Sequence, residues 1–182
     1  MKLSANPVLI GFFPKQIVER PAWLKNQGVR EICSVSECFS SGPANWVQEW
    51  KHNEWGLYDT PELASQVARD KVGEFQVFAY ELFSFRWLNE QEENFSIAAR
   101  LAPLTDAYQS LGYDIVTRSA ATSFECSPLS CNHAAEIHAV NEYCLITDRD
   151  EAYRALTEIS RDGHYEPGPY YLVRVFRKAK AA

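Results

Sequence analysis

The sequence lacks several features that would assign it to a class at once. No apolar run approaches the roughly 18 residues that a membrane-spanning helix needs, so we predict no membrane partner. The N-terminal apolar run is broken by Gly11 and Pro14 and has no small-residue cleavage site, which argues against a secretory signal. Phosphate-loop, dinucleotide-fold, zinc-protease and serine-hydrolase motifs are also missing, which leaves those functions without support.

Positive charge is also scarce. The chain has 18 Lys and Arg against 24 Asp and Glu, a net charge of −6 and an isoelectric point near 5.3. This balance argues against a nucleic-acid partner, because phosphate backbones are bound by basic surfaces. The five cysteines are an odd number, which does not suggest a disulfide framework, so we predict a cytoplasmic protein with reduced thiols.

Two segments carry strong helix signals. In the segment 149–161 an apolar stripe follows Asp148, which can act as the N-cap. In the segment 61–71 the cap is Thr60, and Pro61 occupies the first turn, where proline is favoured. Both segments are therefore predicted to be helices, and each lies between a short strand-like segment and a long one.

The surroundings of the two helices match each other, which predicts an internal duplication. A matched set of residues precedes each helix at a spacing of 88 residues (141 minus 53), with Asn53, Glu54 and Leu57 before the first helix and Asn141, Glu142 and Leu145 before the second. Further upstream, Cys33-x4-Cys38 matches Cys126-x4-Cys131. The identities are few, so chance similarity between amphipathic segments is the alternative.

The order of elements predicts an α+β fold of two tandem ferredoxin-like halves, each with the order βαββαβ. The strands are expected at 8–13, 29–36, 55–59, 74–86, 113–119, 142–147 and 169–177, and the helices at 21–27, 61–71, 104–111 and 149–161. The first strand of the second half is either the end of the long run that starts at Glu74 or the segment 94–99. We expect the halves at 1–87 and 88–182, with the seam at about 88–103.

Each half would have helices on one face of an antiparallel sheet and would leave the other face uncovered. We therefore expect the two halves to pack sheet to sheet. This topology resembles a single-chain form of the dimeric α+β barrel, which implies a pocket between the two sheets. Aromatic residues make up 13% of the chain and could line such a pocket.

The segment FECSPLSCNH, residues 124–133, concentrates reactive side chains. Pro128 favours a turn that would set Cys126 and Cys131 opposite each other. A short helix after Cys131 would lower its thiol pKa and make it a nucleophile, with His133 as the local base. The candidate catalytic residues are Cys131, His133, Cys126 and Glu125, and the candidate ligand-binding residues are Asn132, His138, His52, Trp50 and His164.

Two other interpretations of the same cysteines stay open. Zinc could be bound by Cys126, Cys131, His133 and His138, or by both cysteine pairs together, although structural zinc sites prefer a C-x2-C spacing. Alternatively, the cysteines are buried packing residues on a turn whose serines bond the local backbone.

We therefore predict a small-molecule-binding protein or enzyme with an aromatic-lined pocket between two pseudo-symmetric halves. The first alternative is a non-catalytic acidic interaction protein of the inhibitor or immunity type. The second is a zinc-binding protein that uses the two C-x4-C pairs. The sequence does not identify a cofactor.

Overall fold

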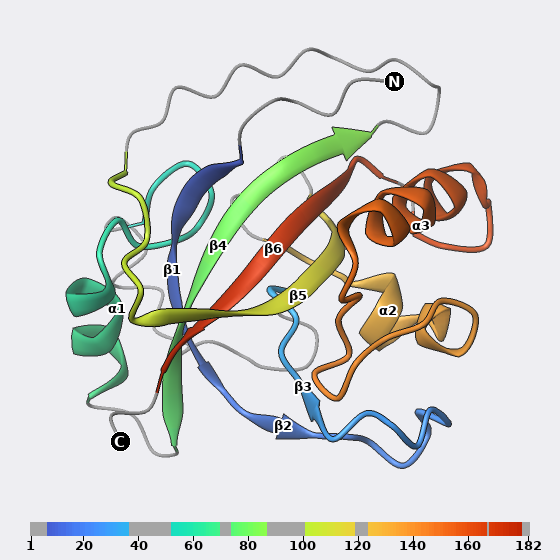
Figure 1. Ribbon diagram of the computed structural model, residues 1–182, viewed down its shortest axis with the longest axis horizontal. Coiled ribbons are helices and arrows are strands. Elements are labelled where there is room, and N and C mark those ends of the chain that lie inside the picture. Colours follow the sequence, from blue (N-terminus) through green and yellow to red (C-terminus); the bar gives the residue numbers. More distant parts are fainter. Residues whose placement is uncertain are drawn as a thin grey trace.

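An antiparallel four-stranded sheet forms the centre of the molecule (Figure 1). The computed structural model describes residues 7–36, 52–69, 74–86, 101–118, 124–166 and 168–179. The sheet order is β1-β4-β6-β5, with β1 (Val8–Gln16), β4 (Phe75–Arg86), β5 (Tyr108–Thr117) and β6 (Tyr170–Lys178). A separate two-stranded ribbon pairs β2 (Val18–Glu19) with β3 (Glu31–Ile32).

Two helices pack against the sheet and lie far apart in the view of Figure 1. Helix α1 (Pro61–Ala68) contacts β1 and β4, and α3 (Arg149–Arg161) contacts β5 and β6. Thr60 caps α1 by accepting a hydrogen bond from the Leu63 N–H, and Asp148 caps α3 in the same way. These caps confirm the helix starts that the sequence predicts. Two shorter elements, α2 (Pro128–Cys131) and the 3-10 turn η2 (Ala134–Glu136), precede α3.

The pairing of β1 with β4 has the same register as the pairing of β5 with β6. Tyr80 of β4 pairs with Val175 of β6, and these residues pair outward with Gly11 and Gly112, respectively. A bulge precedes the glycine in both outer pairings. The register therefore relates β1 and β4 to β5 and β6 by an approximate two-fold rotation.

The predicted helix at 104–111 is wrong, because its second half belongs to strand β5. Gly112 lies inside that strand at φ 143°, and a Cβ atom there would be 2.9 Å from the Leu145 Cβ. Gly11 in β1 has φ 146°, and its Cβ would be 2.6 Å from the Leu57 Cβ. Both glycines let a following turn pack directly on an outer strand. The sequence pattern did not distinguish this role from that of a helix terminator.

The predicted helix at 21–27 is also wrong, because the segment forms turns. The Asn26 Oδ1 accepts a hydrogen bond from the Gly28 N–H at 3.0 Å, a local bond that competes with helix formation. The predicted strand at 29–36 contracts to the two residues of β3, and the chain after β3 crosses the sheet in an irregular conformation.

The short strands predicted before each helix are reduced to single bridges. Tyr58 bridges to Phe12 in the segment 55–59, and Ile146 bridges to Tyr113 in the segment 142–147. Each of these segments is mostly a turn, because an asparagine side chain at its start takes the backbone hydrogen bonds that a strand would use.

The α+β class is confirmed, with one four-stranded antiparallel sheet and few helices. Two ferredoxin-like halves packed sheet to sheet are not confirmed, because β4 and β6 pair edge to edge and join the four long strands into one sheet. Most of the predicted seam lies outside the described residues. No helix of the described ranges is long and apolar enough to cross a bilayer.

Candidate functional site

A turn centred on Asn53 holds α1 against the outer strand β1. The Asn53 Nδ2 donates to the Ile10 carbonyl at 2.9 Å. Its Oδ1 accepts from the Trp55 N–H at 2.9 Å and from the Leu57 N–H at 3.2 Å. One side chain therefore closes the turn and ties it to the strand.

A turn centred on Asn141 does the same between α3 and the other outer strand, β5. The Asn141 Nδ2 donates to the Leu111 carbonyl at 2.6 Å. Its Oδ1 accepts from the Tyr143 N–H at 2.9 Å and from the Leu145 N–H at 3.2 Å. Both turns also contain a residue with positive φ three positions after the asparagine, Gly56 at 71° and Cys144 at 60°.

The match continues into the helices at the same spacing of 88 residues. The buried residues of α1 are Ala64 and Val67, and the corresponding residues of α3, Ala152 and Ala155, are buried as well. This register places Ser65 of α1 at the position that Tyr153 occupies in α3.

A groove of about 770 Å³ runs between α1 and the adjacent ends of three strands. Its α1 wall includes Glu62, Ser65 and the C-cap residue Arg69, which lie on one face of the helix at i, i+3 and i+7. The opposite wall includes Phe75 at the start of β4 and Tyr108 at the start of β5. Both halves of the chain therefore contribute to the groove, and its volume suits a small organic molecule.

Charges of both signs line this groove. Glu62 and Glu74 are carboxylates, and Arg69, Arg177 and Lys178 are cations. Arg177 lies 3.0 Å from the Glu31 carboxylate, whereas the other four residues form no ion pair within the described ranges. The hydroxyl group of Tyr108 is buried and has no hydrogen-bond partner in the described part of the chain. Burial raises the pKa of the Tyr108 hydroxyl, and the nearby Glu62 carboxylate adds to this effect.

The corresponding region of the second half is filled. Tyr153, which stands where α1 has Ser65, packs against a buried apolar cluster that contains Tyr170 and Leu172. Phe75 lies five residues before Tyr80, and Tyr170 lies five residues before Val175, so the two residues correspond. Tyr170 is fully buried, whereas Phe75 is only half-buried. A small side chain on α1 therefore leaves open a space that a tyrosine fills beside α3.

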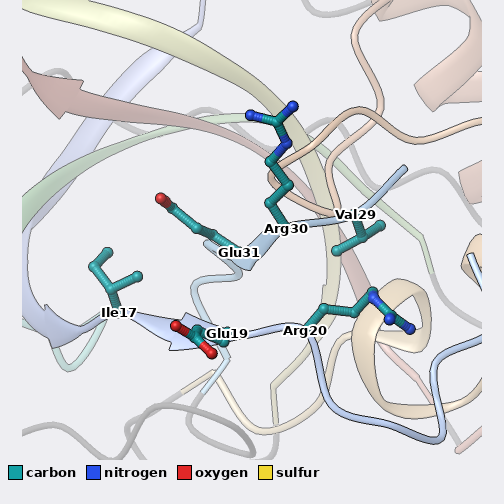
Figure 2. Close-up of a pocket in the computed structure, with 6 residues that line it drawn as sticks. All are labelled: Ile17, Glu19, Arg20, Val29, Arg30 and Glu31. Carbon is teal, nitrogen blue, oxygen red and sulfur yellow. The ribbon is translucent and has the colours of Figure 1, made fainter. Parts of the chain in front are cut away.

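A smaller cavity of about 450 Å³ lies along the ribbon of β2 and β3 (Figure 2). Figure 2 shows the side chains of Arg20 and Arg30 pointing in different directions. Arg30 lies 3.5 Å from the Glu142 carboxylate, and Glu31 lies 3.0 Å from the Arg177 guanidinium. Two of the charged residues that line this cavity are thus already paired within the protein, which makes it a weaker candidate for a ligand site than the groove.

A buried polar cluster ties the segment 33–36 across the sheet face. The Asp114 carboxylate accepts from the Ser34 Oγ at 2.5 Å, from the Val35 N–H at 3.0 Å and from the Ser127 Oγ at 2.6 Å. The Lys15 side chain is only 2% exposed. Its Nζ donates to the Ser34 carbonyl at 2.7 Å and also to the Ser36 carbonyl.

The ionisation of this cluster is governed by its burial. Burial raises the pKa of Asp114, and the hydrogen bonds from Ser127 and Ser34 and the charge of Lys15 oppose that rise only in part. The Tyr80 hydroxyl is fully buried and has no hydrogen-bond partner among the described residues. Burial raises its pKa well above the ordinary value, and the Cys33 and Asp114 groups add to the rise.

The predicted cysteine segment forms the short helix α2, with Cys131 at its last position. The Cys131 side chain is half-buried, and its Sγ lies 3.8 Å from the Ser130 Oγ. Cys126 is buried and its backbone N–H donates to the Thr117 Oγ1 at 3.2 Å, whereas Glu125 is exposed. Catalysis by Cys131 stays a prediction.

The histidines after α2 make contacts with other groups. The His133 Nδ1 lies 2.9 Å from the Glu136 carboxylate, and its ring meets the Trp23 ring edge to face at 5.2 Å. The His138 Nδ1 lies 3.9 Å from the Glu158 carboxylate. The hydrogen bond from His133 lowers the pKa of Glu136.

The remaining predicted site residues are dispersed. Asn132 is the C-cap of α2, where its N–H donates to the Pro128 carbonyl. His52 packs 4.5 Å from the Tyr58 ring in the first half, and His164 is an exposed residue beside Asp162. Trp50 lies outside the described residues.

The described residues contain no group of three or more His, Cys, Asp or Glu side chains that could hold a metal ion. Among the described residues, Cys33, Cys126, Cys131 and Cys144 form no disulfide, and Cys38 lies outside those residues. Burial raises the pKa of Cys33 and Cys144 to about 12, so these two thiols are protonated at neutral pH.

Our sequence interpretation missed the groove and the buried cluster. The groove could have been found by extending the 88-residue match into the helices, which pairs Ser65 with Tyr153 and reveals a loss of volume on one side. No local pattern indicates that Lys15 and Asp114 share one cluster, since they come from opposite outer strands of the sheet.

The chain matches no protein-family model, no curated protein and no solved structure.

Proposed function

We propose that the protein binds a small molecule in the groove between α1 and the ends of β4, β5 and β6. The observation that carries this proposal is the groove itself, a space of about 770 Å³ lined by both halves of the chain. The aromatic side chains of Phe75 and Tyr108 supply apolar surface, and unpaired charges and amides supply polar contacts.

We also propose that the chain is an internal duplication of a strand–turn–helix–strand unit and that it works in the cytoplasm. The matched asparagine turns, the helix register and the strand register support the duplication. One copy has kept a filled interior beside α3, and the other has an open groove beside α1. Ligand binding by one half of a duplicated fold would follow from this difference.

A groove-filling substitution tests the proposed function. Ser65→Tyr copies the tyrosine at the corresponding position of α3 and should block the groove. Ser65→Ala removes the hydroxyl group, which bonds the Pro61 carbonyl at 2.8 Å, without filling the space. Thermal-shift screening of the wild-type protein against a metabolite library should find ligands that Ser65→Ala retains and Ser65→Tyr loses. Equal ligand binding by Ser65→Tyr and the wild type would contradict the proposal.

A second candidate function is that of an interaction protein, and one observation favours it. Trp23 and Ile137 are the large hydrophobic side chains exposed in the described ranges, at 38% and 75%. Their loops are held together by the Asn26 hydrogen bond to the Ala135 carbonyl at 3.1 Å. Exposed apolar side chains on neighbouring loops are typical of protein contact sites.

Site-specific crosslinking tests this second function. A photoreactive residue at position 137 should crosslink to one defined protein in cells, and Trp23→Ala should abolish the crosslink. The same photoreactive residue at the exposed position of Glu158 serves as the control. Crosslinks that are equal at both positions would argue against a docking site.

A further inference from the structure

We propose that the ligand of the groove is a zwitterion of the amino-acid type, with an apolar side chain between an ammonium and a carboxylate group. This inference rests on the proposed function, because it assigns a ligand class to the same groove. It follows from three properties of the lining residues. The unpaired charges of the two signs are equal in number, these charged residues form no ion pairs with one another, and three other side chains supply apolar surface.

The balanced charge selects against singly charged ligands. Among the described residues, the groove is lined by two carboxylates, Glu62 and Glu74, and by three cations. Arg177 is already paired with Glu31, whereas Arg69 and Lys178 form no ion pair in the described ranges, so the unpaired charges balance. A cavity lined by one sign of charge attracts ions of the other sign, whereas a balanced one offers no such net attraction. A ligand with both charges can instead satisfy groups of both signs at once.

The positions of these charges on different walls suit a bipolar ligand. Glu62 belongs to the first turn of α1, whereas Lys178 ends β6 and pairs in register with Tyr108. The Glu62 carboxylate is also near enough to Tyr108 to contribute to the raised pKa of the tyrosine hydroxyl. An ammonium group beside Glu62 and a carboxylate beside Lys178 would therefore contact opposite walls.

The apolar residues of the groove define the rest of the ligand. Phe75, Val77 and Tyr108 belong to the strand side of the lining, and all three are only half-buried. Covering these side chains with an apolar group removes their surface from water, which is worth about 25 cal/mol per Å². The ligand should therefore carry an aromatic or branched aliphatic side chain.

Calorimetric titration with four forms of one compound tests the inference. The probes are phenylalanine, N-acetyl-phenylalanine, phenylalanine amide and N-acetyl-phenylalanine amide, which are a zwitterion, an anion, a cation and a neutral molecule. The zwitterion should bind most tightly, and blocking each end should weaken binding by about two- to fivefold, the contribution of one exposed ion pair.

Two charge-neutralising variants assign the ends. Glu62→Gln should abolish the penalty for acetylating the amine, and Lys178→Gln should abolish the penalty for amidating the carboxylate. Glu158→Gln, on the exposed face of α3, is the control and should leave all four affinities unchanged. All three residues lie at the surface, and thermal unfolding should confirm that each variant folds.

The outcomes separate this inference from the proposed function. Equal affinity for all four compounds, lost together in Ser65→Tyr, would keep the groove as the binding site and reject the zwitterion. Absence of binding for all four compounds would also reject it, while the metabolite screen decides the proposed function independently. Preference for the zwitterion that persists in Ser65→Tyr would place its site elsewhere and overturn the inference.

Discussion

In the first half of the molecule α1 borders an open groove, whereas in the second half α3 packs against a filled apolar cluster. Both helices follow the same asparagine turn, start with the same kind of cap and bury the same two positions. One difference lies at a helix position, where Ser65 lines the groove in α1 and Tyr153 packs against the cluster in α3. Another lies at the start of a strand, where the half-buried Phe75 corresponds to the fully buried Tyr170. A shared backbone frame can therefore carry a packing site on one side and a binding site on the other.

The two halves also differ in their buried polar groups. The glycine match, at a spacing of 101 residues (112 minus 11), pairs Asp114 with Phe13 and Lys15 with Val116. Each half thus contributes one buried charged residue where the other half has an apolar one. These two residues anchor the segment 33–36 across the sheet, so the departure from symmetry has a structural purpose.

The largest expected effect comes from breaking this asymmetric cluster. Asp114→Ala removes the acceptor of three hydrogen bonds and leaves the buried donors of Ser34, Val35 and Ser127 without it. The free energy of unfolding should fall by about 3–5 kcal/mol, because each unsatisfied buried donor costs about 1–3 kcal/mol. Urea denaturation measures this loss, and a loss below about 1 kcal/mol would show that the cluster does not hold the segment.

The contribution of Asp114 to stability should change with pH in a defined direction. Because burial raises the pKa of Asp114 in the folded protein, its contribution favours folding when the carboxyl is protonated. That contribution is complete below the unfolded pKa of about 3.9 and is lost as the pH rises through the raised folded pKa. Asp114→Asn should flatten this part of the stability profile in urea denaturation at different pH values.

The next effect tests the equivalence of the two turns. Asn53→Ala and Asn141→Ala each remove three hydrogen bonds between a turn and its surroundings. At about 1 kcal/mol per bond, each variant should lose about 2–4 kcal/mol of stability. Chemical denaturation should give similar losses for both, and a silent substitution in either turn would break the comparison between the halves.

A smaller effect is expected at the residue with positive φ in the first turn. Gly56→Ala places a Cβ atom on a residue at φ 71°, which should cost about 1 kcal/mol. Gly163→Ala is the matched control, because a Cβ atom there meets nothing within 4 Å. Thermal denaturation should lower the midpoint for the first variant only, and equal midpoints would show that the turn does not require glycine.

The smallest effect, with no expected change in stability, concerns the reactivity of three cysteine thiols. Burial raises the pKa of Cys33 and Cys144 to about 12, so both should react slowly with iodoacetamide at pH 7. Cys131 is half-buried and should be labelled at least about tenfold faster. Mass spectrometry of peptides measures each rate, and labelling of Cys131 as slow as that of Cys33 would remove the case for a nucleophile.

Local signals in the sequence were sufficient for some elements. The caps at Thr60 and Asp148 predicted both helix starts, because a cap satisfies backbone groups within a few residues of itself. The long strands at 74–86 and 169–177 followed from segments rich in aromatic and other apolar residues. The match between Asn53 and Asn141 was also visible as a spacing, and the structure supplied its hydrogen bonds.

Other elements depended on contacts between distant residues. Gly112 resembles a helix terminator in the sequence, and only the approach of Leu145 at 2.9 Å identifies it as a packing glycine in a strand. Asparagine side chains replaced the predicted short strands by turns, which the β-propensity of the flanking residues did not indicate.

By itself, the sequence determined the α+β composition and the two capped helices, because those features depend on neighbours a few residues apart. It also showed the repeated spacing, because each copy of the pattern is local. Only the tertiary structure decided that both halves share one sheet, since the pairing of Tyr80 with Val175 joins residues 95 positions apart (175 minus 80). It also decided where the groove lies. An unfilled space exists only between packed elements, and the small side chain of Ser65 leaves such a space when α1 meets the strand ends.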